Sequence, residues 1–572
     1  MLPFLLVPLE FLLPGYGWIL CSGLNERFGV MEQIALSFIV SVATASLLTA
    51  GLSVLTSHYL TYSVIGSMLL SLILLSIWLL RNRDSRRLSL RFKLDKESIP
   101  LAITLFVYAI VLLMLGWSSP IYPTADAFDP IIHAQIVEGL LSGSGRSLLL
   151  HSTTPIGLHF ASAVLAHLLD LSGLDALRVL LAFVLLDSIL LTYCCARTLL
   201  DPVAAGFTVL IAGFVIPTDA MHFIKVGTFP NMLSDAMVLA VLWLIFVFVK
   251  KPNSTVGLTL AFLTVGGLFV HSTFVVFLAA LWLAVPVFFY FYRASARNYL
   301  KAILFTTGGL LSLAVLFGSF LVANLERVFL GSYGLGSAAP PTPILLTLQT
   351  LVWNFWALAG GLAPLLIAVA IVRVFLRKKT IAGVAFACVW LGTLALAMIV
   401  STEGWRFILL SLVPGSFLIG DLLAALFASQ IDFLRRGTTT KSLKLFAPLL
   451  LVILVLSGTF IPLLPRVYAP ENRNRQEEIF NSMYWLKQND QGNAVASVGL
   501  SSDYRYLQTL TGIVYVGDFN ESANSTVAAS RGANFSYVAV AVQNSQFPTF
   551  QSSSMVVEKY RNSIVAIFFI PA

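Results

Sequence analysis

Apolar runs long enough to cross a lipid bilayer recur along most of this chain. A bilayer core of about 30 Å requires roughly 20 consecutive apolar residues in a helix, and runs of this kind continue to about residue 464. Hydrophobic residues are 58% of the 572 residues, charged residues are 11%, and the mean hydropathy is +0.89. A water-soluble domain of this size does not have these values, so the sequence predicts an α-helical polytopic membrane protein.

The apolar segments predict about fourteen transmembrane helices. The first run, Met1 to Leu20, has no basic residue ahead of it and contains Glu10 and three prolines. We therefore interpret it as a retained span and not as a cleaved signal peptide. The other predicted spans are residues 31–54, 62–80, 100–118, 178–198, 203–217, 231–249, 255–271, 272–292, 302–323, 350–372, 381–400, 405–427 and 445–464.

Basic loops predict the orientation of these spans. Residues 81–98, RNRDSRRLSLRFKLDKES, form a short loop rich in Arg and Lys, and such loops stay in the cytoplasm. The later basic loops reach the same side only if residues 155–171, which contain His159 and His167, are not a span. We predict instead that this segment is a helix lying along the outer surface. The loop that follows residues 100–118 is then external.

That first external loop contains the densest group of chemically active residues, in YPTADAFDPIIHAQIVEG at 122–139. A helix is predicted from Asp129, and Asp129 and His133 share one face of it because they are four residues apart. Asp126 lies in the entry turn, and Glu138 adds a third carboxylate further along. One ligand can therefore contact both the carboxylate and the imidazole.

Three interpretations of this group remain open from the residues. Asp129 is an N-cap that closes the first turn of an interfacial helix. Alternatively, a carboxylate is a general base held by its neighbour. In the third interpretation, Asp126 and Asp129 form an oxygen-rich site for a divalent cation, Mg²⁺ or Mn²⁺, together with a phosphate. A capping aspartate can also be catalytic, so these interpretations do not exclude one another.

Further outer elements supply other polar residues. The segment at 218–231 contains Asp219, His222 and Lys225, and STEGWR at 401–406 contains Glu403 and Arg406. An arginine at this depth can bind phosphate oxygens in a bidentate manner or anchor the helix at the interface. Lys225 has the same two interpretations, phosphate binding or snorkelling. Between these elements, residues 324–343 are rich in Gly, Ser and Pro and predict a mobile flap.

From Arg466 the composition becomes that of a soluble domain. We predict an amphipathic helix at 471–488 and strands at 494–498, 513–516, 537–542, 555–559 and 564–570, with further helices at 503–511 and 522–530. This order indicates a small α/β domain. Three Asn-X-Ser/Thr sequons, at Asn520, Asn524 and Asn534, favour an extracellular location. We therefore divide the chain into N-terminal helices with a basic loop (1–98), a transmembrane core with an external loop at 119–175 (99–465), and an external domain (466–572).

These features together resemble the C-type (GT-C) glycosyltransferases of membranes. The resemblance rests on the external Asp129-x-x-x-His133 motif, the helix that follows it, KVGTFPN at 225–231, WRFILLSLVPG at 405–415 and the soluble C-terminal domain. The opening LLPGYGWIL at 12–20 is similar to the start of uncharacterised archaeal membrane families of the same group. The WWDYG-like signature of oligosaccharyltransferases is absent, and so is the protein-mannosyltransferase form of the acidic motif.

The resemblance implies transfer of a sugar from a polyprenyl-phosphate carrier to a glycan, protein or lipid acceptor at the outer face of the cell membrane. By the same resemblance, Asp129 or Asp126 is the catalytic carboxylate and His133 supports it. The substrate-binding residues are expected among Glu138, His159, Asp219, His222, Lys225, Glu403 and Arg406, with Lys225 and Arg406 on the lipid phosphate.

Two other function classes remain open. Asp187, Asp235 and Asp421 lie within or near the ends of apolar runs, and intramembrane carboxylates often mark ion pathways in transporters and flippases. No inverted repeat supports that alternative. A non-catalytic scaffold or sensor is the third class. The net charge of +8 is explained by the cytoplasmic loops, and no nucleic-acid-binding motif occurs.

Overall fold

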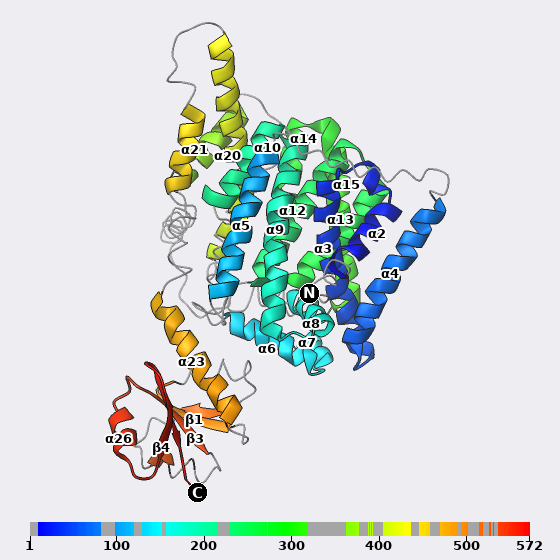
Figure 1. Cartoon of the computed structure of the whole chain (residues 1–572). Helices are drawn as coiled ribbons and strands as arrows, with labels where there is room; N and C mark the ends of the chain where they lie inside the picture. Colours follow the sequence, from blue (N-terminus) through cyan, green and yellow to red (C-terminus); the bar gives the residue numbers. More distant parts are fainter. Residues whose placement is uncertain are drawn as a thin grey trace, which may run out of the picture.

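The computed structural model describes residues 10–81, 98–118, 129–151, 156–215, 229–271, 273–318, 322, 362–376, 387, 389, 392, 404–435, 446–457, 470–489, 494–500, 514–518, 525–527, 530 and 536–571. It is a helical bundle with a small sheet at the C-terminus (Figure 1). The helices are α2 (Leu13–Cys21), α3 (Val30–Leu55), α4 (Tyr59–Arg81), α5 (Ile99–Ser118), α6 (Asp129–Leu141), α7 (Gly145–His151), α8 (Gly157–Leu169), α9 (Gly173–Leu199), α10 (Pro202–Leu210), α12 (Phe229–Lys250), α13 (Ser254–Val270), α14 (Thr273–Phe291), α15 (Arg293–Leu316), α18 (Ala363–Leu376), α20 (Gly404–Arg435), α21 (Phe446–Ser457), α23 (Pro470–Asn489) and α26 (Phe547–Ser552), with short helical turns η1 (Leu24–Glu26) and η3 (Ile211–Val215).

The predicted spans coincide with these helices where the structure describes them. Among the described residues, six helices are long and apolar enough to cross a membrane, and seven further apolar helices are shorter. The class of polytopic helical membrane protein is therefore confirmed. The count of about fourteen spans stays a prediction because residues 323–361 and most of 377–403 lie outside the described part.

Helix α12 forms the centre of the bundle, and α4 lies at its edge. In the most apolar window of α12, 94% of residues are buried, against 17% in the equally apolar window of α4. The few buried side chains of α4 include Ser63, Ser67 and Ser71, which recur every four residues and so lie on one face. The remaining, apolar surface of α4 is left for lipid.

The two ends of the bundle differ in their residues. At one end, which we call the basic end, Arg27 donates to the carbonyl of Lys251 (3.4 Å) and Arg81 donates to that of Cys21 (3.3 Å). At the opposite end, the loop end, α6, α7 and α8 lie against the ends of the long helices (Figure 1). Tyr59, at the start of α4, donates to the carbonyl of Leu140 there. The C-terminal sheet is on the side of the loop end (Figure 1).

Helix α8 corrects one sequence expectation. It lies within the predicted segment 155–171 and, with 13 residues, is not one of the six described helices long enough to span, as predicted. It does not lie on the surface, however, because its residues from Gly157 to Ala166 are buried. It packs between α3, α6 and α9. The apolar side chains around His159 are covered on all sides by these helices, whereas His167, nearer its end, is exposed.

The C-terminal domain has the predicted α/β form. Its strands are β1 (Ala494–Val498), β2 (Val514–Asp518), β3 (Tyr537–Ala541), β4 (Val557–Arg561) and β5 (Val565–Phe569), in the order β2-β1-β3-β5-β4. The β2-β1-β3 part is parallel, and β5 pairs antiparallel with β3 and β4. Helix α23 covers one face through Ile479 and Met483, and the unpredicted α26 covers the other through Phe550. The helix expected at 503–511 lies outside the described residues, as does most of the one at 522–530.

Candidate functional site

Helix α6 carries the central motif and begins at Asp129, as predicted. It packs on α8 and on the start of α9, and this fixes it at the loop end. Asp126 lies outside the described residues, and for Asp129 the structure describes the backbone only. The first helical residue carries partial positive charge from the unpaired backbone N–H groups, which favours a carboxylate or phosphate there.

His133 and His159 form a buried pair between α6 and α8. His133 Nδ1 lies 2.8 Å from His159 Nε2, and the exposed fractions of the two residues are 7% and 0%. The ring of Phe229, the first residue of α12, lies 5.6 Å from the ring of His133. Helices α6, α8 and α12 therefore meet at His133.

Burial fixes the charge of this pair. It holds the pKa of His159 well below the usual value, and the nearby positive charge of His133 lowers that pKa further. The backbone of Ile156 acts on this pKa in the opposite direction, but it is the smallest of the three contributions, and His159 Nδ1 has no hydrogen-bond partner of good geometry among the described residues. His159 is therefore neutral at neutral pH, and a proton bound by the pair resides on His133, which then donates to Nε2 of His159.

A close helix contact places His159 beside His133. A Cβ atom on Gly157 would lie 2.9 Å from Cα of Val270, at the end of α13. The Gly157 carbonyl also accepts a hydrogen bond from Ser46 of α3 (2.8 Å). Only glycine allows the start of α8 to approach α13 this closely, so Gly157 determines where the buried imidazole lies.

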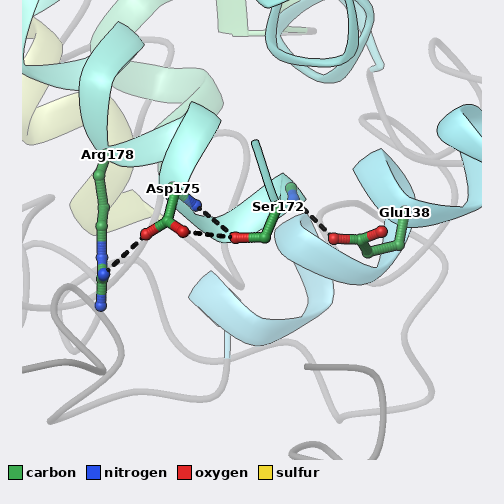
Figure 2. A network of polar contacts seen from close by, with 5 residues as sticks. Glu138, Ser172, Asp175 and Arg178 are labelled. Atoms are coloured by element: carbon green, nitrogen blue, oxygen red, sulfur yellow. Dashed lines mark hydrogen bonds and ion pairs between the residues drawn. The ribbon is translucent and has the colours of Figure 1, made fainter. Parts of the chain in front are cut away.

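Glu138 joins α6 to α9. Its Oε1 accepts a hydrogen bond from the backbone N–H of Gly173 (2.6 Å), where the positive end of the α9 dipole favours a carboxylate. Figure 2 shows the adjoining network: the N-cap Ser172 accepts from the N–H of Asp175, and Asp175 pairs with Arg178 at 2.9 Å. Glu138 thus has a structural contact, and its predicted contact with substrate is not tested by it.

The other predicted residues are only partly placed by the structure. Asp219, His222, Lys225 and Glu403 lie outside the described residues, and Arg406 is described by its backbone as the third residue of α20. The end of the second outer segment does approach the motif, because Phe229 contacts His133. Phe229 lies in the KVGTFPN segment, but neither Phe229 nor Gly173 was predicted as a site residue. Of the intramembrane carboxylates, Asp421 pairs with Arg373 (2.6 Å).

The described residues contain no cluster of three His, Cys, Asp or Glu side chains that could hold a metal ion. Nδ1 of His133 lies against Nε2 of His159 and not against a group of carboxylates. The predicted Mg²⁺ or Mn²⁺ site therefore rests on Asp126 and Asp129, whose side chains lie outside the described part.

Comparison with known proteins identifies the fold. No protein-family model and no curated protein sequence matches the chain. Among solved structures, ArnT from Cupriavidus metallidurans bound to undecaprenyl phosphate matches with a TM-score of 0.52 and 12% identity, over 82% of this chain and 97% of that chain. The Archaeoglobus fulgidus oligosaccharyltransferase tethered to an acceptor peptide matches with a TM-score of 0.51 and 12% identity, over 78% of this chain and 70% of that one.

These similarities show a fold shared with these two membrane proteins, and the structure has the helical core and the small C-terminal sheet that the sequence predicted. Within that fold, the loop end brings together a helix that begins with a carboxylate residue, an imidazole that can carry a proton, and the start of α12. Such a group can exchange a proton with a ligand and attract an anion to the helix start.

Proposed function

We propose that this protein is a membrane glycosyltransferase. It moves a sugar from a polyprenyl-phosphate carrier to a protein, glycan or lipid acceptor at the outer membrane face. The observation that carries the proposal is the fold, which extends over 97% of ArnT, a protein solved with undecaprenyl phosphate. The second structural neighbour was solved with an acceptor peptide. A polyprenyl-phosphate donor and an acceptor are thus the two substrates that we propose here.

The distribution of charge supports the outer location of the site. Arg27, Arg81 and Lys251 gather at the basic end, and short basic segments favour the cytoplasm. The loop end, with His133 and Glu138, is then on the outer side. The C-terminal domain lies on that same side, and we propose that it is extracellular.

We assign the reacting roles to the first external loop. Asp129 or Asp126 takes the proton of the acceptor hydroxyl or amide as the acceptor oxygen or nitrogen bonds to the anomeric carbon. The bond from that carbon to the phosphate oxygen breaks, and its electron pair leaves with the phosphate. Positive charge stabilises this leaving group, and we assign that role to Lys225 and Arg406, with His133 supporting the carboxylate.

A divalent cation is proposed only at Asp126 and Asp129. It would orient the acceptor or the phosphate through oxygen ligands, the chemistry that Mg²⁺ and Mn²⁺ favour. Glu138, His159, Asp219, His222 and Glu403 remain proposed substrate contacts.

The transporter alternative is favoured by one observation. Asp187 and Asp235 are both buried and both line cavities within the bundle, about 480 Å³ and 40 Å³ in volume. Substrate movement across proteoliposomes that depends on Asp187 or Asp235, without any sugar transfer, would support that alternative over the enzyme. The fold similarity favours the enzyme.

The deciding experiment uses the full chain in proteoliposomes with radiolabelled hexose on undecaprenyl phosphate or dolichyl phosphate, and a membrane extract as acceptor. We expect Asp129→Asn to lower transfer by about 10² to 10⁴-fold, the usual contribution of a general base, with unchanged thermal stability. Asp170→Asn is the matched control, because Asp170 is an exposed carboxylate at the same end whose left-handed backbone (φ 53°) suits asparagine. Full activity of Asp129→Asn would contradict the catalytic role of Asp129. If the wild-type chain transferred no sugar from either carrier, the proposed glycosyltransferase activity would be wrong.

A further inference from the structure

An apolar cavity of about 480 Å³ lies between the start of α2, α3, α5 and α9. Cavities of roughly 300 to 1,000 Å³ are the size that binds small molecules. The wall includes Phe11, Phe38, Phe106 and Phe183, and among the described lining residues Asp187 is the only polar one. The cavity therefore combines a large apolar surface with a single carboxyl group.

The cavity is separate from the candidate functional site. Asp187 lies near the middle of α9, about 20 Å along the helix from Gly173 at a rise of 1.5 Å per residue. Gly173 is the residue that contacts Glu138 at the loop end. A ligand of this cavity would thus be held at hydrocarbon depth, and an inference about it does not rest on the proposed glycosyl transfer.

One oxygen of Asp187, Oδ2, has no hydrogen-bond partner in this apolar wall among the described residues. The exposed fraction of Asp187 is 6%. Buried polar groups are nearly always hydrogen-bonded, because leaving one unpaired is costly. A polar intramembrane side chain of this kind usually marks a functional site. The carboxyl is placed to bind a polar group that arrives with a ligand.

Lipid is the source from which such a ligand would enter. Phe106 and Phe183 line the cavity, yet 66% and 41% of their surfaces are exposed. At this depth of a membrane bundle, exposed apolar side chains face the acyl chains of the bilayer. The opening of the cavity is therefore lateral, and a molecule dissolved in the bilayer can enter without passing through water.

We propose that this cavity binds a lipid alcohol, a molecule with one neutral hydroxyl on a long apolar chain. The chain lies against the aromatic wall, and the hydroxyl donates a hydrogen bond to Oδ2 of Asp187, which has no other partner among the described residues. A lipid amine fits less well, because its ammonium must lose its hydration at hydrocarbon depth before it can pair with the carboxyl. A plain hydrocarbon leaves Asp187 without a partner. Phe11 and Phe38 belong to the N-terminal region 1–98, so the proposal gives this region a role in ligand binding.

The test is photolabelling of the full chain in nanodiscs with three probes that carry the same mid-chain diazirine: hexadecanol, hexadecylamine and hexadecane. We expect hexadecanol to label peptides of α5 and α9 most strongly, and unlabelled hexadecanol to compete for them. Asp187→Leu should weaken labelling by hexadecanol about tenfold, the effect of one lost hydrogen bond of about 1.4 kcal/mol, to the level of hexadecane. Asp187→Asn, which keeps a donor and an acceptor, should stay within about threefold of wild type.

A second variant separates the cavity from the carboxyl. Ala109 is a half-buried lining residue of α5, and Ala109→Trp would fill the space and remove labelling by all three probes. The proposal is overturned if Asp187→Leu labels as strongly as wild type, if hexadecylamine labels more strongly than hexadecanol, or if hexadecane labels equally. If a variant fails to fold, labelling of the wild-type chain by the three probes still tests whether the cavity prefers an alcohol over an amine and a hydrocarbon.

Discussion

The histidine pair at the loop end and Asp187 in the middle of the bundle are both buried, but they differ in their partners. His133 and His159 lie 2.8 Å apart and contact helices from three parts of the chain. Asp187 lies in an apolar wall, and its Oδ2 has no partner among the described residues. A buried polar group with a protein partner holds helices and side chains in place, whereas one without a partner is open to a ligand.

The largest effect is expected from His133 itself. His133→Phe removes the imidazole that can carry a proton beside Asp129, so we expect sugar transfer to fall about 100-fold or more. Asp187→Asn should leave the transfer rate within about twofold, because Asp187 lies about 20 Å from the loop end. The matched control is His167→Phe, which removes the exposed histidine of α8. If a folded His133→Phe variant transferred sugar at the wild-type rate, the loop end would be no more important for transfer than the cavity at Asp187.

The contact that positions His159 is tested next. Gly157→Val adds side-chain atoms where the backbone of Val270 already lies 2.9 Å from the Cβ position, so we expect a loss of about 1 to 3 kcal/mol in unfolding free energy. Gly139→Ala on α6 is the control, since its Cβ would meet only Leu148 at 3.6 Å, an ordinary contact. Thermal unfolding in detergent measures both. Equal stability of the two variants would show that the start of α8 is not held tightly.

The neutral state of His159 predicts a pH dependence. Its pKa is lowered well below the ordinary value of about 6.5 by burial and by His133, so only the unfolded chain takes up this proton as the pH falls. The contribution to stability is complete above pH about 6.5 and is lost below it, by up to about 1.4 kcal/mol per pH unit. His159→Phe should flatten this slope. A slope that is unchanged in that variant would assign the acid sensitivity to other groups.

The smallest effect is expected at Glu138. Glu138→Gln keeps an oxygen that can accept from the N–H of Gly173 but removes the charge at the start of α9, so the expected loss is about 0.3 to 1 kcal/mol. Glu558→Gln on the exposed strand β4 should be neutral. A larger loss of transfer than of stability in Glu138→Gln would indicate that this residue also contacts substrate.

Hydropathy located the helices but did not indicate which of them are buried and which face lipid. The spans predicted at 62–80 and 231–249 correspond to α4 and α12, whose apolar windows have mean hydropathies of 2.3 and 2.5. One faces lipid and the other is almost wholly buried, because lipid and protein interior both favour the same apolar side chains. Burial of α8 was missed for a different reason: its histidines indicated a surface, yet Nε2 of His159 pairs with a second buried imidazole.

The candidate site was predicted in part. The helix predicted from Asp129 begins at that residue in the structure, because a helical pattern is local in sequence. The contact of His133 with His159 and Phe229 depends on how three helices pack, which no spacing records. Glu138 was expected to contact substrate, and its contact with Gly173 depends likewise on the junction of α6 and α9.

Helix α20 is longer than the hydrocarbon core of a bilayer is thick. The predicted span 405–427 is part of a helix of 32 residues, Gly404–Arg435, which is about 48 Å long and so exceeds a hydrocarbon core of about 30 Å. Its last turns stand clear of the other helices at the basic end (Figure 1). Arg406 is on the opposite tip, and Pro414 lies between them, where a helix bends most easily. A displacement of the protruding end would therefore reach Arg406 only through the segment at Pro414, where the helix can bend.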